Sequence, residues 1–148
     1  MTKFFLAGII QGSIAGPAIH PQDYRKRLKA VLLKHVPGAE VYCPIEHHPD
    51  SLGYSEALGR EVFFGHVEQA AESDCLVAFI PEASMGTAVE MWEANRRGTP
   101  VLTVSPLAEN WAVKFLSTRV FADIDAFEEF IRSGELAKVL AKPKEKRR

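Results

Sequence analysis

The stretch SDCLVAFIPEASMGTAVEMWEA, residues 73–94, decides the fold of this chain. Its residues 75–80 form a continuous run of six apolar side chains, CLVAFI, which ends at Pro81. Such an uninterrupted run is typical of a parallel β-strand that is covered on both faces. The stretch therefore predicts an α/β protein in which helices pack on both sides of a parallel sheet.

The second half of the stretch predicts a helix. Ser84 is a favourable N-cap residue, so we expect the helix to begin near Met85. It then continues to about Arg97, where Gly98-Thr99-Pro100 stops it. Ligands of open α/β sheets bind beyond the carboxyl ends of the strands, where helix N-termini present free N–H groups. The loop 81–87 is therefore the first candidate for a binding site.

The same alternation of strand and helix continues along the chain. Apolar runs predict five strands, at about residues 3–10, 40–43, 75–80, 100–104 and 118–121. Amphipathic or capped segments predict helices at about residues 21–35, 55–72, 85–97, 111–116, 123–132 and 135–141. We therefore expect a three-layer α/β sandwich with a parallel five-stranded sheet, of the flavodoxin-like or Rossmann-like class. Residues 1–141 form one domain in this interpretation, and the basic segment 142–148 is a frayed tail.

The composition agrees with one globular domain. The chain has 148 residues, of which 47% are hydrophobic and 25% charged, and its formal net charge is −1. These values are typical of a soluble globular protein and give no argument for binding to nucleic acid or membranes. No apolar run approaches the length of a membrane span, and the apolar N-terminal segment is too short for a signal peptide. We therefore expect a cytoplasmic protein.

The sequence lacks the usual signals for a metal or a cofactor. Cys43 and Cys75 do not have metal-site spacing, and we expect both to be reduced and buried. The adjacent His47 and His48 have no evident further ligand. The glycines of the first loop, residues 11–17, follow neither the dinucleotide pattern G-x-G-x-x-G nor the phosphate-loop pattern. We therefore predict no metal and no cofactor.

Two segments before the central stretch bear on the site. In the helix 21–35 we expect an inner apolar stripe, with Arg25 and the neighbouring basic residues on a solvated outer face. The segment 44–54 is predicted to be a long polar loop at the carboxyl end of the second strand, on the same sheet edge as the loop 81–87. Tyr54 or a histidine of this polar loop is a candidate for contact with a substrate.

Glu90 is the candidate catalytic residue. At 3.6 residues per turn it shares a helix face with three small residues, Gly86, Thr87 and Ala94, which leave room for a ligand over its carboxylate. Its sequence neighbours are apolar, and a glutamate half-buried in such surroundings can serve as a nucleophile or a general base. The alternative is an ordinary exposed helix glutamate, as we expect for Glu93.

Two motifs resemble those of a known family. The first is Phe5-Leu6-Ala7-Gly8 on the first strand. The second is Ser73-Asp74-x-x-Val77-Ala78 followed by Pro81-x-x-Ser84-x-Gly86-Thr87-x-x-Glu90-x-x-x-Ala94. Over residues 3–132 the chain resembles the nucleoside 2-deoxyribosyltransferase-like superfamily. That superfamily includes the transferases, the 2′-deoxynucleoside 5′-phosphate N-hydrolases and related nucleotide N-glycosidases.

The resemblance implies a role for each matching residue. Glu90 falls at the position of the family's nucleophile, whose carboxylate attacks the anomeric carbon and forms a glycosyl-enzyme ester that water or a second base resolves with net retention. Ser84, with Gly86 in the same motif, falls where the phosphate-using hydrolases bind the 5′-phosphate at a helix N-terminus. Gly8 would let the backbone approach the sugar.

The chain departs from the family pattern at three substrate-binding positions. His66 stands where the family often has an aspartate, Ile9 where the nucleotide hydrolases carry a second phosphate-binding serine, and Phe5 where they carry tyrosine. These changes leave the identity of the substrate open between a nucleoside and its 5′-monophosphate. They do not remove the nucleophile.

In this superfamily a neighbouring subunit often completes the site. The segment that begins with Asn110 occupies the region that crosses over, so Lys114 would supply a cation for phosphate and Asn110 a hydrogen bond for base or sugar. The alternative is an ordinary surface helix. Trp92 and Trp111 are candidates for a subunit interface, and we expect a homodimer or a higher even-numbered homo-oligomer.

Several functions remain open from the sequence. The first is cleavage of the N-glycosidic bond of a (deoxy)nucleoside or its 5′-monophosphate, with transfer of the sugar to water or another base. The second is a nucleoside 2-deoxyribosyltransferase that strictly requires an acceptor base. The third is a non-catalytic nucleotide-binding or sensing module, which the histidine at position 66 motivates. A flavodoxin-like electron carrier is disfavoured, because the first loop lacks a phosphate cradle rich in Ser and Thr.

Overall fold

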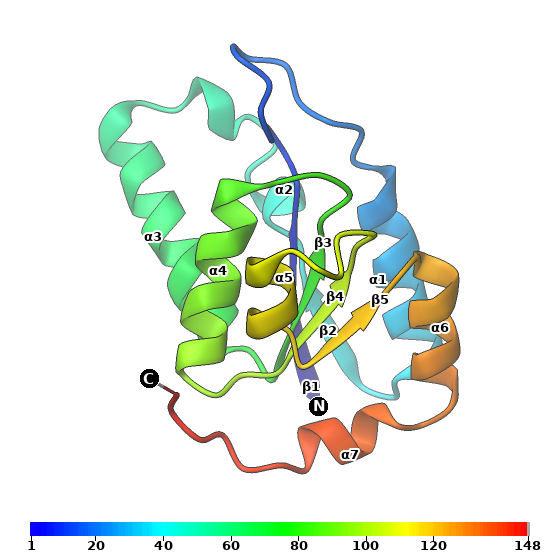
Figure 1. Cartoon of the computed structure of the whole chain (residues 1–148). Helices are drawn as coiled ribbons and strands as arrows, with labels where there is room; N and C mark the ends of the chain where they lie inside the picture. Colours follow the sequence, from blue (N-terminus) through cyan, green and yellow to red (C-terminus); the bar gives the residue numbers. More distant parts are fainter. Residues whose placement is uncertain (148) are drawn as a thin grey trace.

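The fold is built on one parallel sheet at the centre of the molecule (Figure 1). The computed structural model describes residues 1–147. The strands are β1 (Thr2–Gly8), β2 (Ala39–Tyr42), β3 (Cys75–Phe79), β4 (Val101–Val104) and β5 (Arg119–Phe121). They pair in the order β2-β1-β3-β4-β5, and every pair is parallel. The predicted five-stranded parallel sheet is therefore confirmed.

Helices cover both faces of the sheet and make the structure three-layered. They are α1 (Asp23–His35), α2 (Pro44–His47), α3 (Glu56–Glu72), α4 (Met85–Arg96), α5 (Trp111–Leu116), α6 (Ile124–Arg132) and α7 (Leu136–Leu140). Figure 1 shows α1 and α6 on one side of the sheet and α3, α4 and α5 on the other. No helix in residues 1–147 combines the length and the apolar character needed to cross a bilayer. The predicted three-layer α/β class is confirmed.

The two faces of the sheet form two separate cores. Phe4 and Leu6 of β1 pack with α1 and α6, whereas Phe5 and Ala7 pack with α3 and α4. Side chains alternate between the faces of a strand, so a strand covered on both faces buries the side chains that point to either side. This explains why the strand segments 4–7 and 75–78 are apolar throughout and fully buried.

The segment 44–54 is not the single long polar loop that the sequence predicts. It contains the short helix α2 and a 3₁₀ turn, η1 (Ser51–Gly53). Pro44 stands in the first turn of α2. Proline favours that position because its fixed φ suits the helix and its missing N–H is not needed there. The segment is therefore an ordered wall at the carboxyl edge of the sheet.

Gly8 ends β1 where α1 approaches it most closely. A Cβ atom on residue 8 would lie 2.3 Å from the hydroxyl oxygen of Tyr24. Tyr24 is buried and donates a hydrogen bond of 2.9 Å to the carbonyl of Ile9. Position 8 is therefore glycine because the Tyr24 ring fills the space of a side chain.

The chain returns to the amino ends of the strands after α7. Lys144 Nζ donates to the carbonyl of Ser73 at 2.7 Å, and the backbone N–H of Arg147 donates to the carbonyl of Arg96 at 2.8 Å. Gly98, with a φ of +82°, contacts the backbone of Glu145, which a Cβ would meet at 2.5 Å. That the segment 142–148 is a frayed tail remains a prediction, and its last residue, Arg148, lies outside the described part of the chain.

Candidate active site

A cavity of about 220 Å³ lies beyond the carboxyl end of β1. Its polar and charged lining includes Arg25 of α1, His48 after α2, Tyr54 before α3, His66 of α3 and Glu90 of α4. The strand order reverses direction between β1 and β3, because β2 lies on one side of β1 and β3 on the other. This is the kind of topological switch point at which open α/β sheets bind ligands.

Glu90 and His66 line this cavity from adjacent helices and have opposite pKa shifts. Burial raises the pKa of Glu90 from 4.5 to about 8, against the opposing effect of the Arg25 guanidinium. Burial lowers the pKa of His66 from 6.5 to about 4, and the positive charges of His48, His47 and Arg25 act in the same direction. At neutral pH the cavity therefore holds a largely protonated carboxyl group and a neutral imidazole. A pair of groups whose pKa values are driven apart is a mark of acid–base sites.

Arg25 is the main correction to the sequence analysis. It was predicted on a solvated outer face, but it is only 3% exposed. Its guanidinium donates to the carbonyls of Leu6 and Gly8, each at 3.1 Å, and to Oε1 of Gln22 at 2.7 Å. These acceptors satisfy a cation that would otherwise be unfavourable to bury. The site thus has a fixed positive charge in the cavity wall.

A network of aromatic and histidine side chains holds His66. The Tyr42 hydroxyl lies 3.2 Å from Nε2 of His66. The His48 ring meets the His66 ring edge-on, with centroids 5.2 Å apart, and Nδ1 of His48 lies 2.9 Å from the Tyr54 hydroxyl. These contacts fix the His66 ring and leave it a neutral hydrogen-bonding group on the cavity wall.

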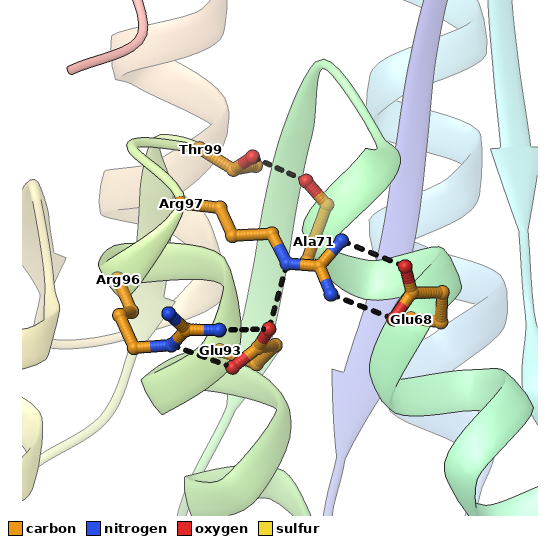
Figure 2. Close-up of polar contacts among 6 residues, drawn as sticks. All are labelled: Glu68, Ala71, Glu93, Arg96, Arg97 and Thr99. Atoms are coloured by element: carbon orange, nitrogen blue, oxygen red, sulfur yellow. Dashed lines mark hydrogen bonds and ion pairs between the residues drawn. The ribbon is translucent and has the colours of Figure 1, made fainter. Parts of the chain in front are cut away.

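An ion-pair cluster joins α3 to α4, as Figure 2 shows. Arg97 donates two hydrogen bonds of 2.7 Å to the carboxylate of Glu68 on α3, and a third of 2.6 Å to Glu93 on α4. Nearby, Thr99 Oγ1 donates to the carbonyl of Ala71 at 2.6 Å. A bidentate arginine–carboxylate pair fixes geometry as well as adding energy. The cluster therefore fixes the position of α3, which carries His66, relative to α4, which carries Glu90.

The structure brings four of the predicted site residues to the cavity: Gly8, Tyr54, His66 and Glu90. Of the two loop histidines offered as candidates, it brings His48 to the cavity, and it adds Arg25 and Gln11, which sequence reasoning did not single out. For His48, the only sequence signal was its place in the polar segment at the carboxyl edge. Arg25 gave no local signal at all, because its acceptors belong to another element.

The structure does not bring Phe5 and Ile9 to the cavity. Each is only 1% exposed. Phe5 stacks beneath Tyr42, with centroids 5.5 Å apart, and the carbonyl of Ile9 accepts hydrogen bonds from Tyr24 and Gln22. Both side chains are therefore packed in the interior, and neither lines the cavity that holds Glu90.

The remaining predicted residues lie on the rim or on α5. Ser84 precedes α4 as predicted, but its Oγ bonds to Oγ1 of Thr87 at 2.8 Å and not to a backbone N–H. Gly86 is exposed in the first turn of α4. Asn110 caps α5 by accepting from the backbone of that helix, and Lys114 pairs with Glu109 at 3.1 Å. None of these side chains lines the cavity within the described chain.

Within residues 1–147, no three His, Cys, Asp or Glu side chains are grouped so that they could hold a metal ion. The histidines near the cavity instead bond to tyrosine hydroxyls and to a backbone carbonyl.

Comparison with solved structures places this arrangement among known folds. The structure is similar to that of the 2-deoxyribosyltransferase from the psychrotolerant bacterium Bacillus psychrosaccharolyticus, with a TM-score of 0.67 and 23% identity, over 95% of this chain and 98% of that one. This chain therefore shares its fold with that 2-deoxyribosyltransferase. No known family model matches the sequence, and no curated protein matches it.

Two further structures show how widely the fold is shared. A conserved protein from Enterococcus faecalis V583 matches with a TM-score of 0.63 and 19% identity, over 90% of this chain and 99% of that one. The flavoenzyme FerB, an NAD(P)H:(acceptor) oxidoreductase from Paracoccus denitrificans, matches with a TM-score of 0.52 and 14% identity, over 94% and 96%. The fold therefore does not decide the chemistry, and the site must do so.

Replacing Glu90 by glutamine is expected to stabilise the protein at alkaline pH. Between pH 4.5 and about 8, folded Glu90 keeps a proton that the unfolded chain has released, so its contribution to stability falls as pH rises. Glu90→Gln removes this slope and should raise the free energy of unfolding by roughly 2–4 kcal/mol above about pH 8, with little difference near pH 4.5.

Urea unfolding of wild type and Glu90→Gln across this pH range tests the expectation. His66 has the opposite slope between about pH 4 and 6.5, but it is present in both proteins and cancels. Glu82→Gln, at an exposed position in the loop before α4, is the control and should show no pH-dependent difference. A constant difference between Glu90→Gln and wild type at all pH values would contradict a raised Glu90 pKa.

Proposed function

We propose that this chain is an enzyme that cleaves the N-glycosidic bond of a (deoxy)nucleoside or its 5′-monophosphate through Glu90, in a retaining double displacement. The observation that supports it is the placement of Glu90: its carboxyl group lines the cavity at the end of β1, partly desolvated, with the Arg25 cation in the cavity wall. A nucleophilic carboxylate must be ionised, close to the sugar and poorly hydrated. The fold shared with a 2-deoxyribosyltransferase agrees with this chemistry.

The proposed reaction has two displacements. In the first, a Glu90 oxygen forms a bond to the anomeric carbon while the bond to the base nitrogen breaks. The departing base takes the electron pair and then a proton from water, which leaves hydroxide in the solvent. In the second, the oxygen of water or the nitrogen of a second base attacks the same carbon and loses a proton to the neutral His66 imidazole, and Glu90 leaves as a carboxylate. Each step inverts the anomeric carbon, so the configuration is retained overall.

His66 has a supporting role in this proposal. With a pKa of about 4 it is neutral at physiological pH, so it acts as a hydrogen-bonding group and proton acceptor, not as a cationic acid. The Tyr42 hydroxyl and the His48 ring hold it against the cavity wall. We propose that it orients the attacking water or the sugar next to Glu90, in place of the family aspartate.

Two alternatives remain as proposals. A strict transferase would use the same Glu90 ester but release product only with an acceptor base. A non-catalytic binding module is motivated by His66, which cannot supply the negative charge of an aspartate. For phosphate binding, the first turn of α4 with Ser84 and Gly86 is the candidate region, although neither residue lines the cavity.

Release of free base from nucleosides and nucleotides tests the proposed cleavage. Purified protein incubated with a panel of ribo- and deoxyribonucleosides and their 5′-monophosphates, with and without an acceptor base, should release free base, measured by chromatography. Glu90→Ala should lower this release at least about a thousandfold, and Glu82→Gln should leave it unchanged. Release only with an acceptor would favour the strict transferase. Equal release by Glu90→Ala would exclude the nucleophile, and no release by any protein would favour the binding module.

The rate of cleavage is expected to depend on pH through the protonation of Glu90. Because ionised Glu90 is required, kcat/KM should rise about tenfold per pH unit up to about pH 8. Arg25→Met removes the charge that lowers the Glu90 pKa, so the midpoint should move to higher pH, with activity partly restored under alkaline conditions. Arg25→Lys keeps the charge and is the matched control, with circular dichroism to verify folding. A rate that falls between about pH 6 and 8 would assign Glu90 an acid role instead.

We also propose that the protein forms a homodimer or a higher even-numbered oligomer in which a neighbouring subunit approaches the cavity. Large apolar side chains are exposed on the helix layer α3–α5: Phe64 (55%), Met85 (80%), Trp92 (53%), Trp111 (77%) and Phe115 (61%). Exposed aromatic residues in such numbers are typical of interfaces. Asn110 and Lys114, which lie on the same layer, would then face the partner.

The oligomer is tested by sedimentation velocity. Wild type should sediment as a dimer or a larger even-numbered species, and Trp92→Glu should shift it towards the monomer, because a charge would be buried in the interface. Leu33→Glu, at a 53% exposed position of α1 on the opposite face of the sheet, is the control and should not change the sedimentation. A monomeric wild type would contradict the proposal.

Buried thiols agree with a cytoplasmic protein, which we propose as its location. Cys43 and Cys75 are free and buried, and burial raises the pKa of the Cys75 thiol. Free cysteines persist most readily in a reducing compartment.

A further inference from the structure

A second cavity, of about 380 Å³, adjoins the one that Glu90 lines. The two share a wall of four residues, Ile10, Ile45, Ser51 and Leu52. We call this second cavity the side chamber; beyond the shared wall it is lined by Pro17, Ile19, Pro49, Asp50 and Gly53. Its walls therefore come from the loop after β1 and from the segment around η1.

The lining of the side chamber is mostly apolar and contains one carboxylate. Six of its nine lining residues are isoleucine, leucine or proline, and Asp50 is the one charged residue among those that the described chain contributes. Apolar walls suit the faces of a flat heteroaromatic ring, whereas a single carboxylate suits a hydrogen-bond donor on its edge. It is a poor site for phosphate, which the Asp50 charge would repel.

We infer that the side chamber binds the leaving base and favours bases that carry an exocyclic amino group near Asp50. This inference rests on the proposed N-glycosidic cleavage and deepens it, because it names the class of base. The ligands it predicts are nucleosides or nucleotides of amino-substituted bases, such as those of cytosine or adenine. Their oxo counterparts, uracil and hypoxanthine, are expected to bind less well.

The position of the chamber relative to Glu90 supports this assignment. Glu90 lines the first cavity but not the side chamber, and the four shared residues border both spaces, which makes them neighbours. In a displacement at the anomeric carbon, the nucleophile and the leaving group occupy opposite sides of that carbon. A sugar in the first cavity can therefore face Glu90 on one side and have its base in the side chamber on the other.

Asp50 supplies the basis for discrimination. An aspartate accepts hydrogen bonds and has none to donate, so it pairs with an amino group and repels a carbonyl oxygen. Hydrogen bonds to a charged partner discriminate strongly when water is excluded, but Asp50 is exposed on the rim. We therefore expect a preference of about tenfold in kcat/KM for the amino member of a pair.

Matched pairs of substrates test the inference. The pairs are 2′-deoxycytidine with 2′-deoxyuridine and 2′-deoxyadenosine with 2′-deoxyinosine, each also as its 5′-monophosphate. Wild type should prefer the amino member of each pair, and Asp50→Asn should abolish the preference, because an amide both donates and accepts. Asp23→Asn, at an exposed position in the first turn of α1, is the control and should keep it. Ile19→Glu, which changes only the side chamber, should raise KM for all members about tenfold or more.

The outcomes separate this inference from the proposed function. Turnover with no amino preference, or with a preference that Asp50→Asn leaves intact, would overturn the chamber assignment and leave the Glu90 chemistry standing. Absence of turnover with every substrate would count against the proposed function. In that case calorimetric titration with cytosine, uracil, adenine and hypoxanthine decides the chamber. Binding of the amino bases that is lost in Asp50→Asn would support it, and no binding would overturn it.

Discussion

The buried guanidinium of Arg25 is the interaction on which the arrangement of the site depends. It joins the carbonyls of Leu6 and Gly8, near the end of β1, to the first turn of α1 and to Gln22. A buried cation is unfavourable unless acceptors surround it, so these contacts fix where the strand ends and how α1 approaches it. The same charge acts on Glu90 across the cavity and opposes the effect of burial on its pKa. One side chain therefore links the backbone geometry of β1 to the protonation of the candidate nucleophile.

The cavity places two titratable groups in unfavourable environments for their charged forms. Burial keeps a proton on Glu90 and keeps one off His66, so at neutral pH neither of these two groups adds a full charge to that of Arg25. A ligand that displaces water or adds charge near these groups would change both equilibria together. The rigid parts around them, the Tyr42–His66 contact and the Glu68–Arg97–Glu93 cluster, keep the two helices in place while that happens.

The sequence predicts the fold well because its strongest signals are local. The apolar run 75–80, the start of α4 at Met85 and the bounds of α5 all follow from neighbouring residues, and the structure confirms them to within a residue or two. The short helices in 44–54 were missed, although Pro44 is a typical first-turn residue. The helical pattern of α1 placed Arg25 outside, because periodicity registers polarity and carries no information about acceptors on another element.

The site residues also divide into those that a local motif predicts and those that depend on contacts with distant segments. Gly8 and Glu90 are parts of short motifs at the ends of adjacent strands, and both line the cavity. Phe5 and Ile9 came only from matching positions to a family pattern. They lie in or beside an apolar strand that is covered on both faces, where every side chain is buried. Arg25 and the side chamber depend on contacts between segments far apart in the sequence, which no local pattern records.

The return of the chain after α7 has a practical consequence. The hydrogen bonds of Lys144 and Arg147 hold the last described residues against the start of β3 and the end of α4. Thr2, at the start of β1, lies nearby. Figure 1 shows the N-terminus and the last described residues on the side of the sheet away from the loop after β1. An affinity tag, a fusion partner or a tether to a solid support attached at either end would therefore leave the mouth of the cavity open.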